Sequence, residues 1–107
     1  MSDISNYSAF DGMSFRDIEN FGLMMEQKYN QAPSGSALEN LYRQARQIAF
    51  NAAVNSFQSE VMNMSQQYLY QIQDEYNQKY NQAPSGSARE QYFRQVRDIA
   101  RSRLGIR

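Results

Sequence analysis

The feature that most limits how this chain can fold is an internal repeat. Residues 27–37, Gln-Lys-Tyr-Asn-Gln-Ala-Pro-Ser-Gly-Ser-Ala, recur without change as residues 78–88, fifty-one positions later. Similarity continues downstream, where Glu39, Arg43, Gln44, Arg46, Ile48 and Ala49 recur as Glu90, Arg94, Gln95, Arg97, Ile99 and Ala100. Upstream the copies have diverged, although Ser14 aligns with Ser65 and Ile18 with Leu69. A repeat of this length is typical of duplicated two-helix units.

The centre of each repeat predicts a turn between two helices. Pro33 and Pro84 end the helix before them, because proline lacks an N–H and disfavours the α conformation in the preceding residue. Gly35 and Gly86 permit a tight turn. The next helix then begins with a capping box, in which serine and glutamate side chains accept hydrogen bonds from backbone N–H groups. The two boxes are Ser36 with Glu39 and Ser87 with Glu90. The sequence therefore predicts a helical hairpin, twice.

The segment between the two turns predicts a long helix. It contains neither Gly nor Pro between Gly35 and Pro84, and its apolar residues alternate in spacings of four and three, as in a coiled coil. These residues are Phe50, Val54, Phe57, Val61, Met64 and Tyr68. We expect one helix over 36–82, with shorter helices at about 14–31 and 87–104 folded back on its ends. The alternative is a break near Asn55 and Ser56, which would close the chain into a four-helix bundle.

The predicted fold class is thus all-α, a tandem duplicated helical hairpin in which two short helices flank one long central helix. Four segments follow from the repeat: an N-terminal arm (1–13), a first hairpin repeat (14–55), a connecting part of the central helix (56–64) and a second hairpin repeat (65–107). If the central helix is unbroken, the short helices cover only its ends. Phe57, Val61, Met62 and Met64 would then be exposed. An exposed apolar patch usually marks an interaction surface. We therefore assign self-association to the Phe50–Tyr68 seam as a hypothesis; the alternatives are an ordinary core or a foreign helical partner.

Charge is unevenly distributed along a chain whose net charge is zero. Residues 1–40 sum to −4 and residues 86–107 to +4. Arg94, Arg97 and Arg101 fall on one face of the last predicted helix. This basic face suits an acidic protein partner or head-to-tail contact between copies. Nucleic acid is a further possible partner that the zero net charge disfavours.

The absence of Cys and His removes most catalytic and metal-binding designs. The usual zinc ligands are missing, as are the imidazole base and the cysteine nucleophile of many enzymes. Paired carboxylates such as Glu19 and Glu26 are expected on a polar face. We predict no enzyme activity, no cofactor, no metal and no small-molecule substrate.

Membrane and export signals are also lacking in the sequence. No run of eighteen apolar residues occurs, and residues 1–7 have no basic or apolar region typical of a signal peptide. We expect no membrane partner, and a protein located in the cytoplasm or in an assembled particle.

The chain is rich in amides, with thirteen Gln and nine Asn, a composition that suits subunits packed against copies of themselves. The sequence favours a non-enzymatic structural or interaction subunit that forms homo-oligomers, as in a filament, scaffold or virion-type assembly. One alternative is a nucleic-acid-binding accessory protein that uses the basic helix. The other is a helical adaptor for another protein.

Overall fold

The computed structural model describes residues 10–106, and within them the regular structure is helical, with no β-strand. The prediction of an all-α fold is confirmed. The elements in order are α1 (Phe15–Gln31), α2 (Ala37–Glu60), the 3-10 helix η2 (Val61–Asn63), α3 (Gln66–Gln82) and α4 (Ala88–Leu104). The chain divides into two compact units, with the boundary between Asn55 and Ser56. We call Met1–Asn55 unit 1 and Ser56–Arg107 unit 2.

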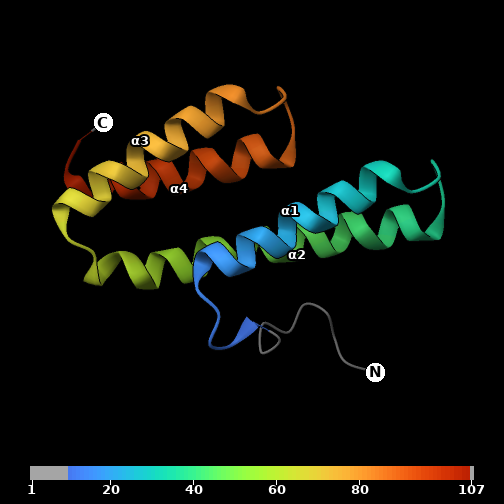
Figure 1. Cartoon of the computed structure of the whole chain (residues 1–107), viewed down its shortest axis with the longest axis horizontal. Helices are drawn as coiled ribbons and strands as arrows, with labels where there is room; N and C mark the ends of the chain where they lie inside the picture. The colour runs from blue at the N-terminus through green and yellow to red at the C-terminus, as the bar shows by residue number, and fades with distance from the viewer. Residues whose placement is uncertain (1–9, 107) are drawn as a thin grey trace. The chain divides into compact units, whose positions relative to one another are not determined.

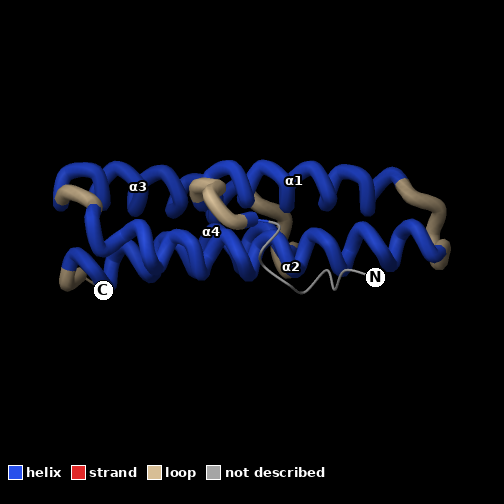
Figure 2. The backbone as a smooth tube through the Cα atoms, turned by 90° about the horizontal axis from the view of Figure 1, so that it is seen from below, coloured by secondary structure: helices blue, strands red, loops and turns tan. Residues whose placement is uncertain are grey.

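Each unit contains a pair of helices joined by the repeated turn. Figure 1 shows α1 beside α2 and α3 beside α4, and Figure 2 shows the same two pairs from below. This arrangement is compatible with the predicted duplicated hairpin. In unit 1, the α1–α2 contact is close enough that a Cβ at Gly22 would stand 2.7 Å from ring carbons of Phe50.

The first helix of each unit begins and ends at equivalent positions of the repeat. Helix α1 covers Phe15–Gln31 and α3 covers Gln66–Gln82, the same span shifted by the repeat offset. The serines before them, Ser14 and Ser65, both cap their helix by accepting a hydrogen bond from the backbone three residues on. The first helix therefore begins at the same position in both copies of the repeat, although the sequences upstream of the turn have diverged.

The turns have the same geometry in both copies. Ser36 Oγ accepts from the Glu39 backbone N–H at 3.1 Å, and Ser87 Oγ accepts from that of Glu90 at the same distance. Each glutamate carboxylate accepts a hydrogen bond at 2.9 Å from the backbone N–H of the glycine before the capping serine, Gly35 or Gly86. Both glycines have positive φ, +77° and +79°. The turn is thus closed by side chains at a helix start, in a variant of the capping box whose glutamate bonds the N–H just before the cap residue.

The prediction of one unbroken helix over 36–82 is wrong. Helix α2 continues through Asn55 and Ser56, so the alternative break is also misplaced, and ends at Glu60. The chain then forms η2, leaves helical geometry at Met64 with ψ 143°, and starts α3 after Ser65. Because serine caps a helix start by offering its hydroxyl to orphan N–H groups, Ser65 favours a new helix over continuation. The segment 56–64 is therefore a helix end plus a 3-10 turn.

Each unit has its own apolar core. In unit 1 the buried apolar residues are Phe15, Ile18, Met25, Ala49, Phe50, Ala52 and Ala53. In unit 2 they are Phe57, Val61, Leu69, Ile72, Tyr76, Tyr92, Phe93, Val96 and Ala100. The second core is the more aromatic, with Tyr76 edge-on to Phe93 at 5.8 Å and to Tyr92 at 6.5 Å.

Candidate interaction surface

The predicted seam does not form an exposed stripe in this structure. Phe50, Phe57 and Val61 are buried. Val54 and Met64 are partly exposed, and Tyr68 is exposed. The expectation that Phe57 and Val61 face water is therefore wrong. Its premise was a straight helix through residue 64, whereas the chain turns after Glu60. Met62 alone among the four expected residues is strongly exposed, at 61%.

A different apolar stripe is exposed on α2, near the first turn. Leu38 and Leu41 are 52% and 49% exposed, and they lie one turn apart on the same side of the helix. They continue at helical spacing into Ala45 and Ile48, which are half-buried. We call these four residues the Leu38–Ile48 stripe.

The Leu38–Ile48 stripe is separate from the face that α2 packs on α1. The face packed on α1 carries Tyr42, Arg46, Ala49 and Phe50. At 3.6 residues per turn, the mean direction of these residues about the axis of α2 differs from that of the stripe by roughly 100°. Three of them touch α1: Arg46 lies over the ring of Tyr29, Tyr42 lies under Lys28, and Phe50 faces Gly22. Helix α2 therefore has two apolar faces, of which α1 covers one.

Three of the four corresponding positions of α4 carry different residues, and the fourth keeps isoleucine, because Ile48 corresponds to Ile99. Leu38 corresponds to Arg89, Leu41 to Tyr92 and Ala45 to Val96. Tyr92 and Val96 are buried, at 2% and 0% exposure. The exposed leucines are thus a property of the first copy of the hairpin, so they cannot be explained as a shared requirement of the fold.

The basic face is largely engaged within unit 2. Arg97 Nη1 donates to Asn77 Oδ1 at 3.1 Å, its guanidinium pairs with Asp98 at 3.0 Å, and it lies over the Tyr80 ring at 4.7 Å. Arg101 Nε donates to Gln73 Oε1 at 2.6 Å. Only Arg94, of the three predicted arginines, is exposed. These contacts fix two of the arginines to α3, where they tie the hairpin together.

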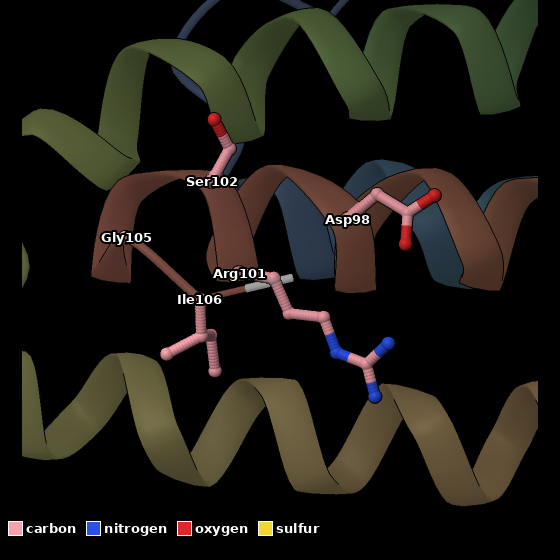
Figure 3. Close-up of a pocket in the computed structure, with 5 residues that line it drawn as sticks. All are labelled: Asp98, Arg101, Ser102, Gly105 and Ile106. Carbon is pink, nitrogen blue, oxygen red and sulfur yellow. The ribbon is translucent and has the colours of Figure 1, made fainter.

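Unit 2 has a shallow hollow at the end of α4. Its volume is about 420 Å³, and it is lined by Asp98, Arg101, Ser102, Gly105 and Ile106. Figure 3 shows that these residues come from one stretch of chain and that the Arg101 side chain points toward α3. A hollow built from one helix end, with its arginine already bonded to Gln73, offers no paired acid and base.

Two carboxylates lie where the sequence did not predict them. Glu19 and Glu26 of α1 are buried, at 3% and 7% exposure, so the expectation that they lie on a polar face is wrong. Both make polar contacts within the protein. Among residues 10–106, no three His, Cys, Asp or Glu side chains come together as metal ligands would. Nor does that part of the chain hold a helix with the length and apolar character needed to cross a bilayer.

Comparison with known proteins adds no family to these observations. No protein-family model matches the chain, and neither curated proteins nor solved structures include one significantly similar to it.

Proposed function

We propose that this protein is a non-enzymatic structural or interaction subunit that self-associates through helical surfaces. Such a role is that of a filament, scaffold or virion-type assembly protein, located in the cytoplasm or in an assembled particle. The observation that carries the proposal is the exposed Leu38–Ile48 stripe. Exposed leucines at helical spacing on a helix that is already packed on its other face favour a second helical surface as partner.

The nucleic-acid alternative is less well supported. Phosphate binding needs arginines that are free to reach the backbone, and Arg97 and Arg101 are held by Asn77 and Gln73. In the adaptor alternative, the same stripe binds a helix of another protein. This alternative predicts that the purified protein is a monomer.

The experiment is a measurement of mass in solution against protein concentration, for the wild type and for Leu41→Glu. We expect the wild type to form dimers or larger species, and the glutamate to shift association to at least ten-fold higher concentration because it places a charge in an apolar contact. Gln47→Glu is the matched control, because it adds the same charge to an exposed position on the far side of α2. It should associate as the wild type does.

A wild type that stays monomeric at every concentration would contradict self-association and favour the adaptor. Equal effects of Leu41→Glu and Gln47→Glu would contradict the stripe as the contact surface. Far-ultraviolet circular dichroism of each variant separates lost association from lost folding.

A further inference from the structure

The boundary between the two units lies inside a helix, because α2 runs from Ala37 to Glu60. Residues 56–60 of α2 and the 3-10 helix η2 therefore belong to unit 2, together with α3 and α4. Figures 1 and 3 show this end of α2 beside α4. Phe57 and Val61, which this segment contributes, are buried, at 0% and 5% exposure. Unit 2 is thus a helical hairpin whose apolar core includes two residues from the segment before it.

The end of α2 lacks the residues that end the other helices. Helices α1 and α3 are each followed by an alanine C-cap and then by Pro33 or Pro84, and α4 by Gly105 with left-handed backbone. After α2, residues 61–65 contain neither glycine nor proline. The chain leaves helical geometry at Met64, with φ −87° and ψ 143°. Every residue of this break is therefore compatible with a helix as well.

The charges at the helix ends differ in the same way. Acidic side chains in the first turn and basic side chains in the last turn stabilise a helix through its macrodipole. Helices α1 and α4 have both, whereas α2 has only the acidic one, Glu39, and α3 only the basic one, Lys79. Helix α2 ends at Glu60, whose charge is unfavourable at a helix C-terminus. In charge, α2 and α3 together resemble one helix that begins near Glu39 and ends near Lys79.

Two interactions favour the break over a continuous helix. One is the cap, in which the Ser65 hydroxyl accepts a hydrogen bond from the Tyr68 backbone N–H at 3.1 Å. The other is the burial of Phe57 and Val61 in unit 2. The cap is lost when α2 and α3 join, but the burial is not, because the hairpin of a second copy offers the same apolar surface.

We propose that two copies of this protein exchange their α3–α4 hairpins, with α2 and α3 of each copy joined into one helix over 37–82. In this swapped dimer, each hairpin covers Phe57 and Val61 of the other copy. The occupant follows from the structure of one chain, since the exchanged contact is the one that unit 2 already makes. The exchange goes beyond the proposed function, because it does not use the Leu38–Ile48 stripe.

Protein concentration during folding selects between the closed chain and the swapped dimer. Unit 2 must open before hairpins are exchanged, so we expect the swapped dimer after refolding from urea at high protein concentration. Protein refolded at low concentration keeps unit 2 closed, and this is the form in which the stripe is tested. The exchange is measured in a Leu41→Glu background, so that association through the stripe does not contribute.

Gln66→Pro distinguishes the broken chain from the joined helix. Gln66 is the first residue of α3, and Ser65 before it is extended, with φ −67° and ψ 155°, so proline fits the broken chain. In the joined helix the same proline lies in the interior, and dimer formation should be weaker by roughly 100-fold or more. The control is Ala88→Pro, at the first residue of α4, where Ser87 is extended in the same way. That helix start is common to both forms, so the control should dimerise as its parent does.

Ser65→Ala should have the opposite effect. It removes the cap of the broken chain and places a better helix former in the joined helix, so we expect about ten-fold more dimer at equal concentration. The control is Ser14→Ala, which removes the equivalent cap of α1. Because α1 begins at the same residue in both forms, the amount of dimer should not change.

Size-exclusion chromatography with light scattering measures the dimer, and nuclear magnetic resonance shows which chain makes each contact. In a dimer refolded from an equal mixture of labelled and unlabelled Leu41→Glu chains, isotope-filtered NOEs should connect Phe57 and Val61 of one chain with α3–α4 of the other. The Cα shifts of Met64 and Ser65 should move to helical values. Circular dichroism of each variant confirms that it folds.

Three results would overturn the exchange. They are the absence of a dimer at every refolding concentration, NOEs of Phe57 and Val61 that stay within one chain, and equal dimer formation by Gln66→Pro and Ala88→Pro. None of them bears on the proposed function, which is tested on protein refolded at low concentration. Loss of stripe association there, with the swapped dimer retained, would overturn the proposed function and leave the exchange standing.

Discussion

Gly22 of α1 lies against the ring of Phe50 of α2, so closely that a Cβ at position 22 would stand 2.7 Å from ring carbons Cδ1 and Cε1 and 3.3 Å from Ala49 Cβ. Glycine is poor in a helix interior, where it costs about 1 kcal/mol relative to alanine. Its presence here is explained by the buried ring, which needs the space. The smallest residue of α1 thus sets how near the two helices of unit 1 approach.

Gly22→Ala is therefore expected to destabilise the protein although alanine favours the helix. Overpacking a core costs about 1–3 kcal/mol, which exceeds the gain of about 1 kcal/mol in helix propensity. Urea unfolding followed by circular dichroism measures the change. In a Phe50→Val background the ring is gone and the 3.3 Å approach to Ala49 Cβ remains, so Gly22→Ala should cost less stability than in the wild type. An equal loss in both backgrounds would show that the ring is not the cause.

The second hairpin fills the same place with a hydrogen bond. Gln73 corresponds to Gly22 and Arg101 to Phe50, and Arg101 Nε donates to Gln73 Oε1 at 2.6 Å. The two copies therefore hold equivalent helix positions together in different ways, one by a ring against glycine and the other by a guanidinium against an amide.

An exchange of these residues follows from the correspondence. Arg101→Phe alone should destabilise unit 2 by about 1–3 kcal/mol, because the ring meets Gln73 and the amide loses its partner. The double change Gln73→Gly/Arg101→Phe reproduces the pairing of unit 1, so the two substitutions should couple favourably by about 0.5–3 kcal/mol. A double-mutant cycle in urea measures the coupling. Additive effects would contradict the equivalence of the two positions.

The turns were predictable from sequence because their chemistry is local. Pro33, Gly35, Ser36 and Glu39 act on backbone groups within four residues of themselves, and every one of these contacts can be stated without a tertiary structure. The duplication strengthens the prediction. The second copy has the same residues at the equivalent positions, Pro84, Gly86, Ser87 and Glu90, and the same residues are expected to form the same turn.

The break after Glu60 does not follow from the spacing of apolar residues. Phe57, Val61 and Met64 keep coiled-coil spacing, but spacing reports only which side chains are apolar and carries no information about where the backbone leaves the helix. The alignment of Ser65 with Ser14 does indicate the break. A serine that caps the first helix of one copy is expected to cap the first helix of the other.

The exposed stripe was missed for a different reason. Leu38, Leu41, Ala45 and Ile48 follow helical spacing as clearly as the core face does, so periodicity gives α2 one broad apolar arc. Which part of that arc is covered depends on where α1 packs, and that is set by the contact of Gly22 with Phe50. This is a tertiary relationship that a single helix cannot reveal.

Gly35→Ala and Gly86→Ala should each destabilise the protein by about 1–2 kcal/mol, the cost of left-handed backbone for a residue with a Cβ. Nothing lies within 4 Å of the point where either methyl group would stand, so conformation and not collision is the cause. The two losses should agree, because φ is +77° in one turn and +79° in the other. Thermal unfolding of the two variants makes the comparison.

The control for the glycine variants is Ser34→Ala, at an exposed neighbouring position. It should change stability by less than about 0.5 kcal/mol, as surface substitutions away from special backbone positions usually do. Unequal losses at the two glycines would contradict a shared turn geometry.

Ser65→Ala tests where α2 ends and α3 begins. The Ser65 hydroxyl accepts from the Tyr68 backbone N–H at 3.1 Å, and losing such a cap costs about 1 kcal/mol. In an unbroken helix the same change would be neutral or stabilising by up to about 0.5 kcal/mol, because alanine is the better helix former. The sign of the change in unfolding free energy therefore distinguishes a new helix that begins after Ser65 from an unbroken helix that runs through it. Ser65→Asp keeps a capping oxygen and should retain wild-type stability, and Ser14→Ala should match the loss at the equivalent helix start.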